Sequence, residues 1–226
     1  MVIVFDLDDT LYEELSYVKS GFRQVSKFME QAFSIPAAKA YPFMRKRLRA
    51  GRHQIFDETL KIFNCYSKKN VQKCLNVYRQ HKPSIRLWKN ANHCLNAFRD
   101  VPLYLVTDGN KIVQHNKILA LGLSDRMKFC FITHIYGIKK AAKPSPYCFF
   151  KICERENVSP GDVIYVGDNP VKDFIGLNKL GFKTIRVLTG AHKGLSGKKG
   201  HDASVSIKSL RDLNRALINK IRDEGS

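Results

Sequence analysis

Val2-Ile3-Val4-Phe5-Asp6-Leu7-Asp8-Asp9-Thr10 joins a strongly apolar stretch to three carboxylates within four residues. The pattern predicts a buried β-strand over residues 2–5 that ends at the acids. Side chains alternate between the two faces of a strand, so Asp6 and Asp8 point to the same side, where their repulsion requires a cation to offset it. Two aligned carboxylates beside a divalent cation favour phosphoryl chemistry, because one Asp can attack as a nucleophile while the other acts as acid and base. The alternative is a strand that ends in an ordinary Asp-rich turn.

The composition is that of a globular protein without a membrane-spanning segment. Of the 226 residues, 44% are apolar and 26% are charged. No run reaches the roughly 18 to 20 apolar residues that cross a bilayer. The N-terminal stretch lacks a basic leader and runs into Asp6, so it is not expected to be a secretory signal. The six cysteines include no CxxC pair, which argues against a zinc site or a disulfide framework. We therefore expect a cytoplasmic protein.

The formal net charge of +19 and the isoelectric point near 9.8 favour anionic partners. Nucleic acid is one such partner, but it is not favoured, because the basic residues are spread along the chain and no zinc-finger or RNP-type motif accompanies them. A basic surface on a phosphate-handling protein accounts better for the charge. No pattern in the sequence indicates an oligomeric state.

Two textures alternate along the chain. Residues 13–85 place apolar side chains near the helical period of 3.6, so an all-helical insertion is expected there. Beyond it, apolar runs that end in turns alternate with helical patterns, which predicts right-handed crossovers and a mostly parallel sheet. The expected elements are a helix at 90–98, strands at 101–106, 127–132, 163–166 and 183–188, helices at 111–121 and from the 163–166 strand to about 180, a loop at 190–200, an edge strand at 203–207 and a closing helix at 210–221. The predicted fold class is α/β, with a Rossmann-like sheet that has helices on both faces, formed by residues 1–12 and 86–226, and a helical cap domain at 13–85.

Polar residues gather at the C-terminal ends of three expected strands, which converge on one crevice in an open parallel sheet. Four motifs follow in order: Asp6-Leu7-Asp8-Asp9-Thr10, Leu105-Val106-Thr107-Asp108-Gly109, Ala142-Lys143-Pro144-Ser145-Pro146 and Gly167-Asp168-Asn169-Pro170-Val171-Lys172-Asp173. With them the chain resembles, over essentially its whole length, the haloacid dehalogenase-like (HAD) superfamily of hydrolases. The resemblance is to the subgroup whose helical cap is inserted just after the first motif.

The resemblance implies a phosphatase that works through an aspartyl-phosphate. Asp6 would attack phosphorus, while Asp8 would protonate the leaving oxygen and then deprotonate the hydrolytic water. This requires Asp6 to be ionised and Asp8 to be protonated at attack. The Thr107 hydroxyl, with the backbone amides of Asp108 and Gly109, would bind phosphate oxygens at a helix N-terminus.

Lys143 would hold the nucleophile and the phosphate in line and compensate their charge. A lone lysine in so basic a chain is otherwise a solvated residue, but Pro144 fixes the backbone where a reaching side chain is needed. Thr10 is expected to orient the acid loop. Asp9 is expected to take no part in the chemistry.

The resemblance also implies a metal site. Asp168 would complete it together with Asp6 and the main-chain carbonyl of Asp8. Asp173 would be a ligand or the partner of a ligand, although an acid near the start of a helix is also favoured by the helix dipole. Oxygen ligands with room for water fit Mg²⁺ better than zinc.

One position departs from the family pattern, because the second motif often carries Asn where this chain has Asp108. The change is tolerable if the residue contributes mainly its backbone amide. If the carboxylate instead contacts phosphate, the replacement Asp108→Asn lowers KM.

Three other functions are weighed against a phosphatase. A dehalogenase needs the nucleophile but no leaving-group acid, and family members of that type lack the second carboxylate, which is present here as Asp8. Phosphonate cleavage would need a cap lysine that forms a Schiff base; residues 13–85 contain several lysines, so this alternative stays open but is not favoured. A phosphate- or nucleic-acid-binding module that has lost turnover is disfavoured because every implied catalytic group is present.

The helical insertion is the most basic part of the chain, with fifteen Lys or Arg against five Asp or Glu over residues 13–85. Consecutive charges point all around a helix, so a solvated surface explains most of them. The sharper hypothesis is that Arg49, Arg52 and His53 bind the anionic remainder of a phosphorylated substrate. We expect that substrate to be a small metabolite, with a sugar phosphate ahead of a nucleoside monophosphate.

Overall fold

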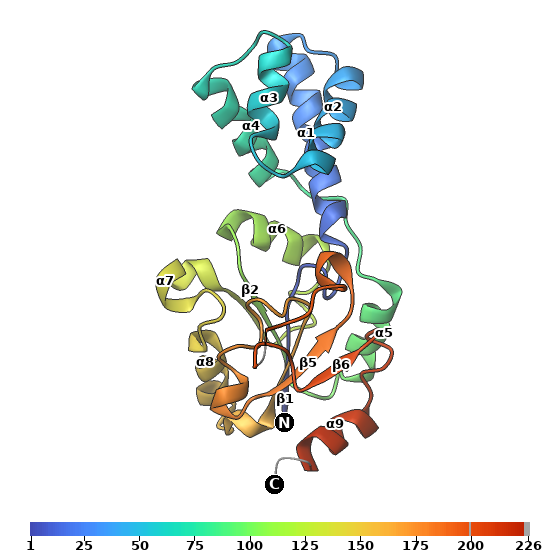
Figure 1. The fold of residues 1–226 in the computed structure, drawn as a ribbon, viewed down its shortest axis with the longest axis vertical. Helices are drawn as coiled ribbons and strands as arrows, with labels where there is room; N and C mark the ends of the chain where they lie inside the picture. The colour runs from blue at the N-terminus through green and yellow to red at the C-terminus, as the bar shows by residue number, and fades with distance from the viewer. Residues whose placement is uncertain (199, 224–226) are drawn as a thin grey trace. The chain divides into compact units, whose positions relative to one another are not determined.

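The computed structural model describes residues 1–198 and 200–223, which form two compact units (Figure 1). One unit combines Met1–Glu14 with Arg86–Ser226, and the other is Leu15–Ile85. The first holds a sheet and the second is helical, so each is described by itself. Lys199, within the loop expected at 190–200, lies outside the described residues.

The first unit is built on a six-stranded sheet in the order β3-β2-β1-β4-β5-β6, with every neighbouring pair parallel. The strands are β1 (Val2–Phe5), β2 (Leu103–Thr107), β3 (Phe129–Ile132), β4 (Val163–Gly167), β5 (Lys183–Val187) and β6 (Val205–Ile207). All four residues of β1 are buried, because the strand lies inside the sheet and both of its faces are covered. The predicted α/β class is therefore confirmed.

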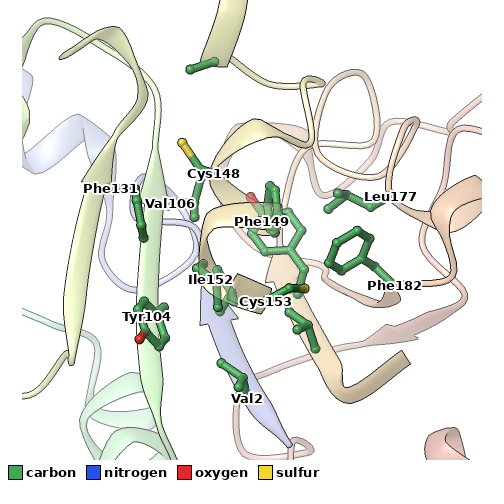
Figure 2. Close-up of a cluster of buried hydrophobic side chains, with 14 of the residues drawn as sticks. Val2, Tyr104, Val106, Phe131, Cys148, Phe149, Ile152, Cys153, Leu177 and Phe182 are labelled. Carbon is green, nitrogen blue, oxygen red and sulfur yellow. The ribbon is translucent and has the colours of Figure 1, made fainter. Parts of the chain in front are cut away.

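Helices cover both faces of this sheet (Figure 1). On one side, α7 (Ile138–Ala141) and α8 (Tyr147–Glu156) follow β3, and α8 turns Cys148, Phe149, Ile152 and Cys153 onto the sheet at helical spacing. They pack with side chains such as Val2, Tyr104 and Phe182 (Figure 2). On the other side lie α5 (Lys89–Ala97) and α9 (Arg215–Asp223). The remaining helical elements of the unit are α6 (Lys111–Ala120) and the short 3₁₀ turns η1 (Thr133–Tyr136), η2 (Pro160–Asp162), η3 (Asn178–Leu180) and η4 (Gly190–His192).

Two expected helices differ from the structure. The segment after β4 forms successive turns and η3 in place of an α-helix. Asn169 explains this, because its Oδ1 accepts the Val171 N–H at 2.9 Å while the Asp173 carboxylate accepts the Asn169 N–H at 2.9 Å, and such local bonds compete with a helix. The closing helix begins at Arg215 and not at residue 210, since Asn214 Oδ1 accepts the Leu217 N–H and caps the helix there.

The second unit contains α1 (Glu14–Phe33, whose first residue belongs to the sheet unit), α2 (Ala37–Ala50), α3 (Ile55–Ile62) and α4 (Lys68–Gln80). Their apolar stripes enclose one core that includes Phe22, Val25, Met29, Met44, Leu60 and Cys74. Ser67 begins α4 as its N-cap, with its hydroxyl accepting the Asn70 N–H at 3.1 Å. The helices predicted within residues 13–85 are thus present.

Candidate active site

The loops after β1, β2 and β4 meet at one edge of the sheet. Phe5 at the end of β1 pairs in register with Leu105 and with Val166, so the residues that follow these strands emerge together. The Asp6 N–H donates to the carbonyl of Val166 at 2.9 Å, which holds the first acid at the end of the neighbouring strand. Parallel pairing alone therefore brings the polar ends of three strands into one place.

Asp6, Asp168 and Asp173 form a buried acidic cluster, in which one oxygen from each carboxylate lies within 4.8 Å of the others. Burial, reinforced by the neighbouring carboxylates, raises the pKa of Asp6 to about 6 and that of Asp168 to about 9. Three converging carboxylates are hard oxygen donors that can hold a cation. The structure thus brings together the acids that the sequence assigned to a metal site.

Lys143 supplies the positive charge of this cluster. Its ammonium pairs with Asp6, lies 2.8 Å from Asp173 Oδ1 and donates to the Tyr165 hydroxyl at 2.9 Å. Burial favours neutral lysine, but Asp173 and Asp6 outweigh it and raise the pKa of Lys143. Burial likewise disfavours ionised Asp173, yet the Lys143 charge prevails and lowers the pKa of that carboxyl. Lys143 and Asp173 are thereby kept charged.

Asp173 is held in place by its own loop. Its Oδ2 accepts the Asn169 N–H, and a Cβ at Gly167 would lie 2.6 Å from that oxygen, so only glycine leaves room for the carboxylate. Tyr165 donates to Asp173 Oδ1 at 3.0 Å while its ring packs edge-on against Phe149, with 4.8 Å between centroids. The tyrosine was not a predicted site residue. The only signal for it is a polar tip within an otherwise apolar strand.

Asp8 has a different environment and is partly exposed. It accepts hydrogen bonds from the Tyr12 hydroxyl, the Gln114 amide and the Lys117 ammonium. Burial alone would raise its pKa, but the charge of Lys117 and these three donors lower it. In the free chain the pKa of Asp6 is therefore higher than that of Asp8. This order is the reverse of the one required at attack, where Asp6 is ionised and Asp8 is protonated.

The second motif lies beside Asp8. Thr107 is buried at the end of β2, and its hydroxyl oxygen accepts the Gln114 amide. The Asp108 carboxylate accepts the Thr133 hydroxyl at 2.6 Å and the Lys143 backbone N–H at 3.2 Å. The side chain at position 108 is thus engaged in joining two loops, which fits a residue that offers its backbone amide to a ligand.

The remaining residues of the first motif support the acids. Thr10 donates to Asp6 Oδ2 at 3.4 Å, in keeping with an orienting role. Asp9, in the left-handed conformation at φ 56°, accepts the backbone N–H groups of Glu14 and Ala191 at 2.9 and 3.0 Å. Asp9 therefore joins the first residue of α1 to η4, and its role is structural.

His192, in η4, is a further neighbour of the acidic cluster that the sequence did not indicate. Its Nδ1 lies 2.7 Å from Asp168 Oδ2. Burial lowers the pKa of this histidine. A single histidine in a Gly/Lys-rich loop forms no sequence pattern from which a site residue could be predicted.

Arg49, Arg52 and His53 belong to the helical unit. Arg49 and Arg52 line a groove of about 250 Å³ together with Lys19 and Arg45, so basic side chains do gather there. Their proposed contact with substrate stays a prediction. Among the described residues, no helix is both long enough and apolar enough to span a bilayer.

Known proteins resemble this chain in sequence and in fold. The family model for haloacid dehalogenase-like hydrolases matches residues 1–181. The glyceraldehyde 3-phosphate phosphatase of Methanocaldococcus jannaschii is 27% identical over 230 residues, covering 95% of this chain and 97% of the relative. The phosphatase of the same name from Pyrococcus abyssi is 26% identical over 227 residues, covering 97% and 94%. The crystal structure of a 2-haloacid dehalogenase from Pseudomonas syringae superposes with a TM-score of 0.66 at 20% identity, over 97% of this chain and 100% of that one.

Proposed function

Because this chain belongs to the haloacid dehalogenase-like hydrolases, we propose that it is a phosphatase that cleaves the phosphate ester of a small sugar phosphate. The relatives named above act on glyceraldehyde 3-phosphate by their names, and they align with this chain over nearly its full length. A short phosphorylated sugar is therefore placed ahead of a nucleoside monophosphate.

One observation carries the choice of reaction. Two carboxylates on the same loop have different surroundings. Asp6 is paired with the buried Lys143 ammonium, whereas Asp8 accepts a hydrogen bond from the Gln114 amide, which also donates to the Thr107 hydroxyl. Transfer of a phosphoryl group needs both a nucleophile and a proton carrier, whereas dehalogenation needs only the nucleophile. The resemblance of the fold to a dehalogenase does not alter this, because the fold does not set the chemistry.

The acidic cluster fits Mg²⁺, since its donors are carboxylate oxygens. Asp6, Asp168 and Asp173 would hold the ion, and the Asp8 carbonyl is the proposed fourth protein ligand. When bound, the ion neutralises charge around the phosphate and favours the ionised form of Asp6.

The side chains of the chain divide the remaining work. Asp6 attacks phosphorus to form the aspartyl-phosphate, while Lys143 and the Thr107 hydroxyl hold the transferred group. The negative phosphate raises the pKa of nearby Asp8, as a like charge does, so that Asp8 can carry the proton to the leaving oxygen. It then takes a proton from water in the second step.

The test is a turnover assay with purified chain and Mg²⁺ on glyceraldehyde 3-phosphate, adenosine monophosphate and p-nitrophenyl phosphate. We expect release of phosphate, with the sugar phosphate giving the larger kcat/KM than the nucleotide. Asp6→Asn should abolish release, whereas the exposed control Asp125→Asn should not. Absence of turnover on every ester, or full turnover by Asp6→Asn, contradicts the proposal.

A further inference from the structure

Two polar residues on one face of α6 are buried next to the motif loops. Gln114 and Lys117 are three positions apart, which stacks their side chains on the same helix face, and they are only 1% and 4% exposed. Burying a lysine and an amide is costly unless each finds partners. Both residues direct their polar ends to the first and second motifs.

Lys117 reaches both oxygens of the Asp8 carboxylate, at 2.7 Å from Oδ1 and 3.0 Å from Oδ2. Gln114 Nε2 adds a bond to Oδ2 at 3.0 Å, and the Tyr12 hydroxyl adds one to Oδ1. A carboxyl group bonded at both oxygens cannot rotate freely. The plane of Asp8 is therefore set from outside its own loop.

The same Gln114 nitrogen donates to the Thr107 hydroxyl oxygen at 2.5 Å. An amide nitrogen can only donate, so the Thr107 oxygen accepts this bond and keeps its own hydrogen for another acceptor. A phosphate oxygen is such an acceptor. One amide thus fixes the orientation of the proton carrier and that of a phosphate-binding hydroxyl.

Gly109 makes room for this amide. Its φ of +137° lies in the region that favours glycine, and a Cβ there would stand 3.2 Å from Gln114 Cγ and Cδ. The backbone conformation at position 109 thus favours glycine, and a Cβ there would also crowd the Gln114 side chain.

We propose that Gln114 and Lys117 are positioning residues of the reaction: they hold the Asp8 carboxyl in the geometry for proton transfer to the leaving oxygen and aim the Thr107 hydroxyl at the phosphate. The inference rests on the proposed phosphatase function. A buried ion pair stabilises a fold little when compared with an apolar pair of the same volume, so stability alone gives weak reason for a lysine at this position.

Leaving groups distinguish this role from a purely structural one. An alkoxide leaving group, as from glyceraldehyde 3-phosphate, needs a proton as it departs, whereas p-nitrophenolate departs as a stabilised anion. We expect Lys117→Met to lower kcat/KM on the sugar phosphate, which reports the attack step and not the later reaction with water, by about tenfold to a hundredfold. This is less than the roughly hundredfold to ten-thousandfold that a positioned acid contributes in full, because Asp8 itself remains. The loss on p-nitrophenyl phosphate should be smaller by at least about fivefold, because its leaving group needs little protonation as it departs. Lys117→Arg should recover part of the sugar-phosphate rate.

A cycle with Asp8→Asn supplies the decisive comparison. If Lys117 acts through Asp8, Lys117→Met should cost the sugar-phosphate reaction nothing further in the Asp8→Asn background. The matched control is Lys179→Met, an exposed lysine in η3, with rates equal to those of the unmodified chain. Melting temperatures of all variants exclude loss of folded protein, and if Lys117→Met does not fold, Gln114→Leu is put through the same comparison.

Equal losses of kcat/KM on both esters, or losses that multiply in the double variant, overturn the positioning role. Failure of the unmodified chain to hydrolyse either ester is a different result, because it overturns the phosphatase proposal itself.

Discussion

Removal of the buried ammonium by Lys143→Met is the sharpest perturbation of the acidic cluster. The Lys143 side chain is 1% exposed, and its partners Asp6 and Asp173 are 7% and 0% exposed, so little water can replace the lost charge. Methionine keeps most of the apolar stem, which confines the change to the charge. Removing one partner of a buried pair costs about 3–5 kcal/mol, and we expect the free energy of unfolding to fall by that amount.

The loss should depend on pH with a definite sign. In the unmodified chain the lowered pKa of Asp173 contributes stability that is present above its ordinary pKa of 3.8 and is lost as pH falls. Without Lys143 that pKa is raised by burial, and stability is then lost as pH rises through the folded-state value. The destabilisation by Lys143→Met should therefore be larger at pH 8 than at pH 5.

The assay is urea unfolding of the full chain in EDTA and in excess Mg²⁺. Trp88 is the only tryptophan of the sequence and lies in the sheet unit, so its fluorescence follows that unit. Mg²⁺ at a hundred times its dissociation constant adds about 2.7 kcal/mol to any site it binds, and the variant, with less positive charge in the cluster, should reach this at a lower concentration.

Lys172→Met is the matched control. It removes the same charge from a lysine whose side chain is 39% exposed and 3.6 Å from the Asp108 carboxylate, which is worth at most about 1 kcal/mol. If Lys143→Met costs no more than Lys172→Met in EDTA, or if both variants respond equally to Mg²⁺, the account of the cluster is refuted.

Three further outcomes are expected. Gly190→Ala should lower the melting temperature and phosphatase activity together, because φ is +63° and the new Cβ would lie 2.2 Å from the Asp9 Cβ; left-handed backbone alone costs about 1–2 kcal/mol, and unchanged melting would contradict this. Burial lowers the pKa of His81, so below its ordinary value of 6.5 the unfolded chain binds a proton that the folded chain does not. Unfolding free energy should then fall by up to about 1.4 kcal/mol per pH unit, and a His81→Phe variant with the same pH slope would refute the assignment. Ser67→Ala removes the cap that accepts the Asn70 N–H and should cost about 1 kcal/mol in denaturation of the helical unit, while an unchanged midpoint would deny the cap any weight.

Much of the site follows from strand order. Asp6, Thr107 and Asp168 each stand at the end of an apolar strand, and parallel strands release their carboxyl ends at one edge, so their meeting could be predicted without coordinates. Lys143 was predicted from the family motif, and the structure places its ammonium against Asp6. The catalytic roles of these residues stay predictions.

The rest depends on packing that no local pattern encodes. Gln114 and Lys117 read as part of an ordinary amphipathic helix, and Tyr165 as one more buried strand residue, because the partner of each comes from a distant loop. The α-helix predicted after β4 is absent for the opposite reason, because there a local contact decides the structure. There, Asn169 takes up backbone hydrogen bonds locally, and its side chain overrides a plausible helical pattern.

Tyr165 makes the interior of the sheet unit part of its chemistry. The ring is packed among Phe149 and Phe174, while the hydroxyl at its tip touches both Lys143 and Asp173. A cavity opened on the α8 side of the sheet, among the side chains of Figure 2, would tilt that ring and move the hydroxyl. Engineering for heat resistance that repacks this core should therefore screen each variant for turnover as well as for melting temperature, since a substitution harmless to folding can still misplace the lysine.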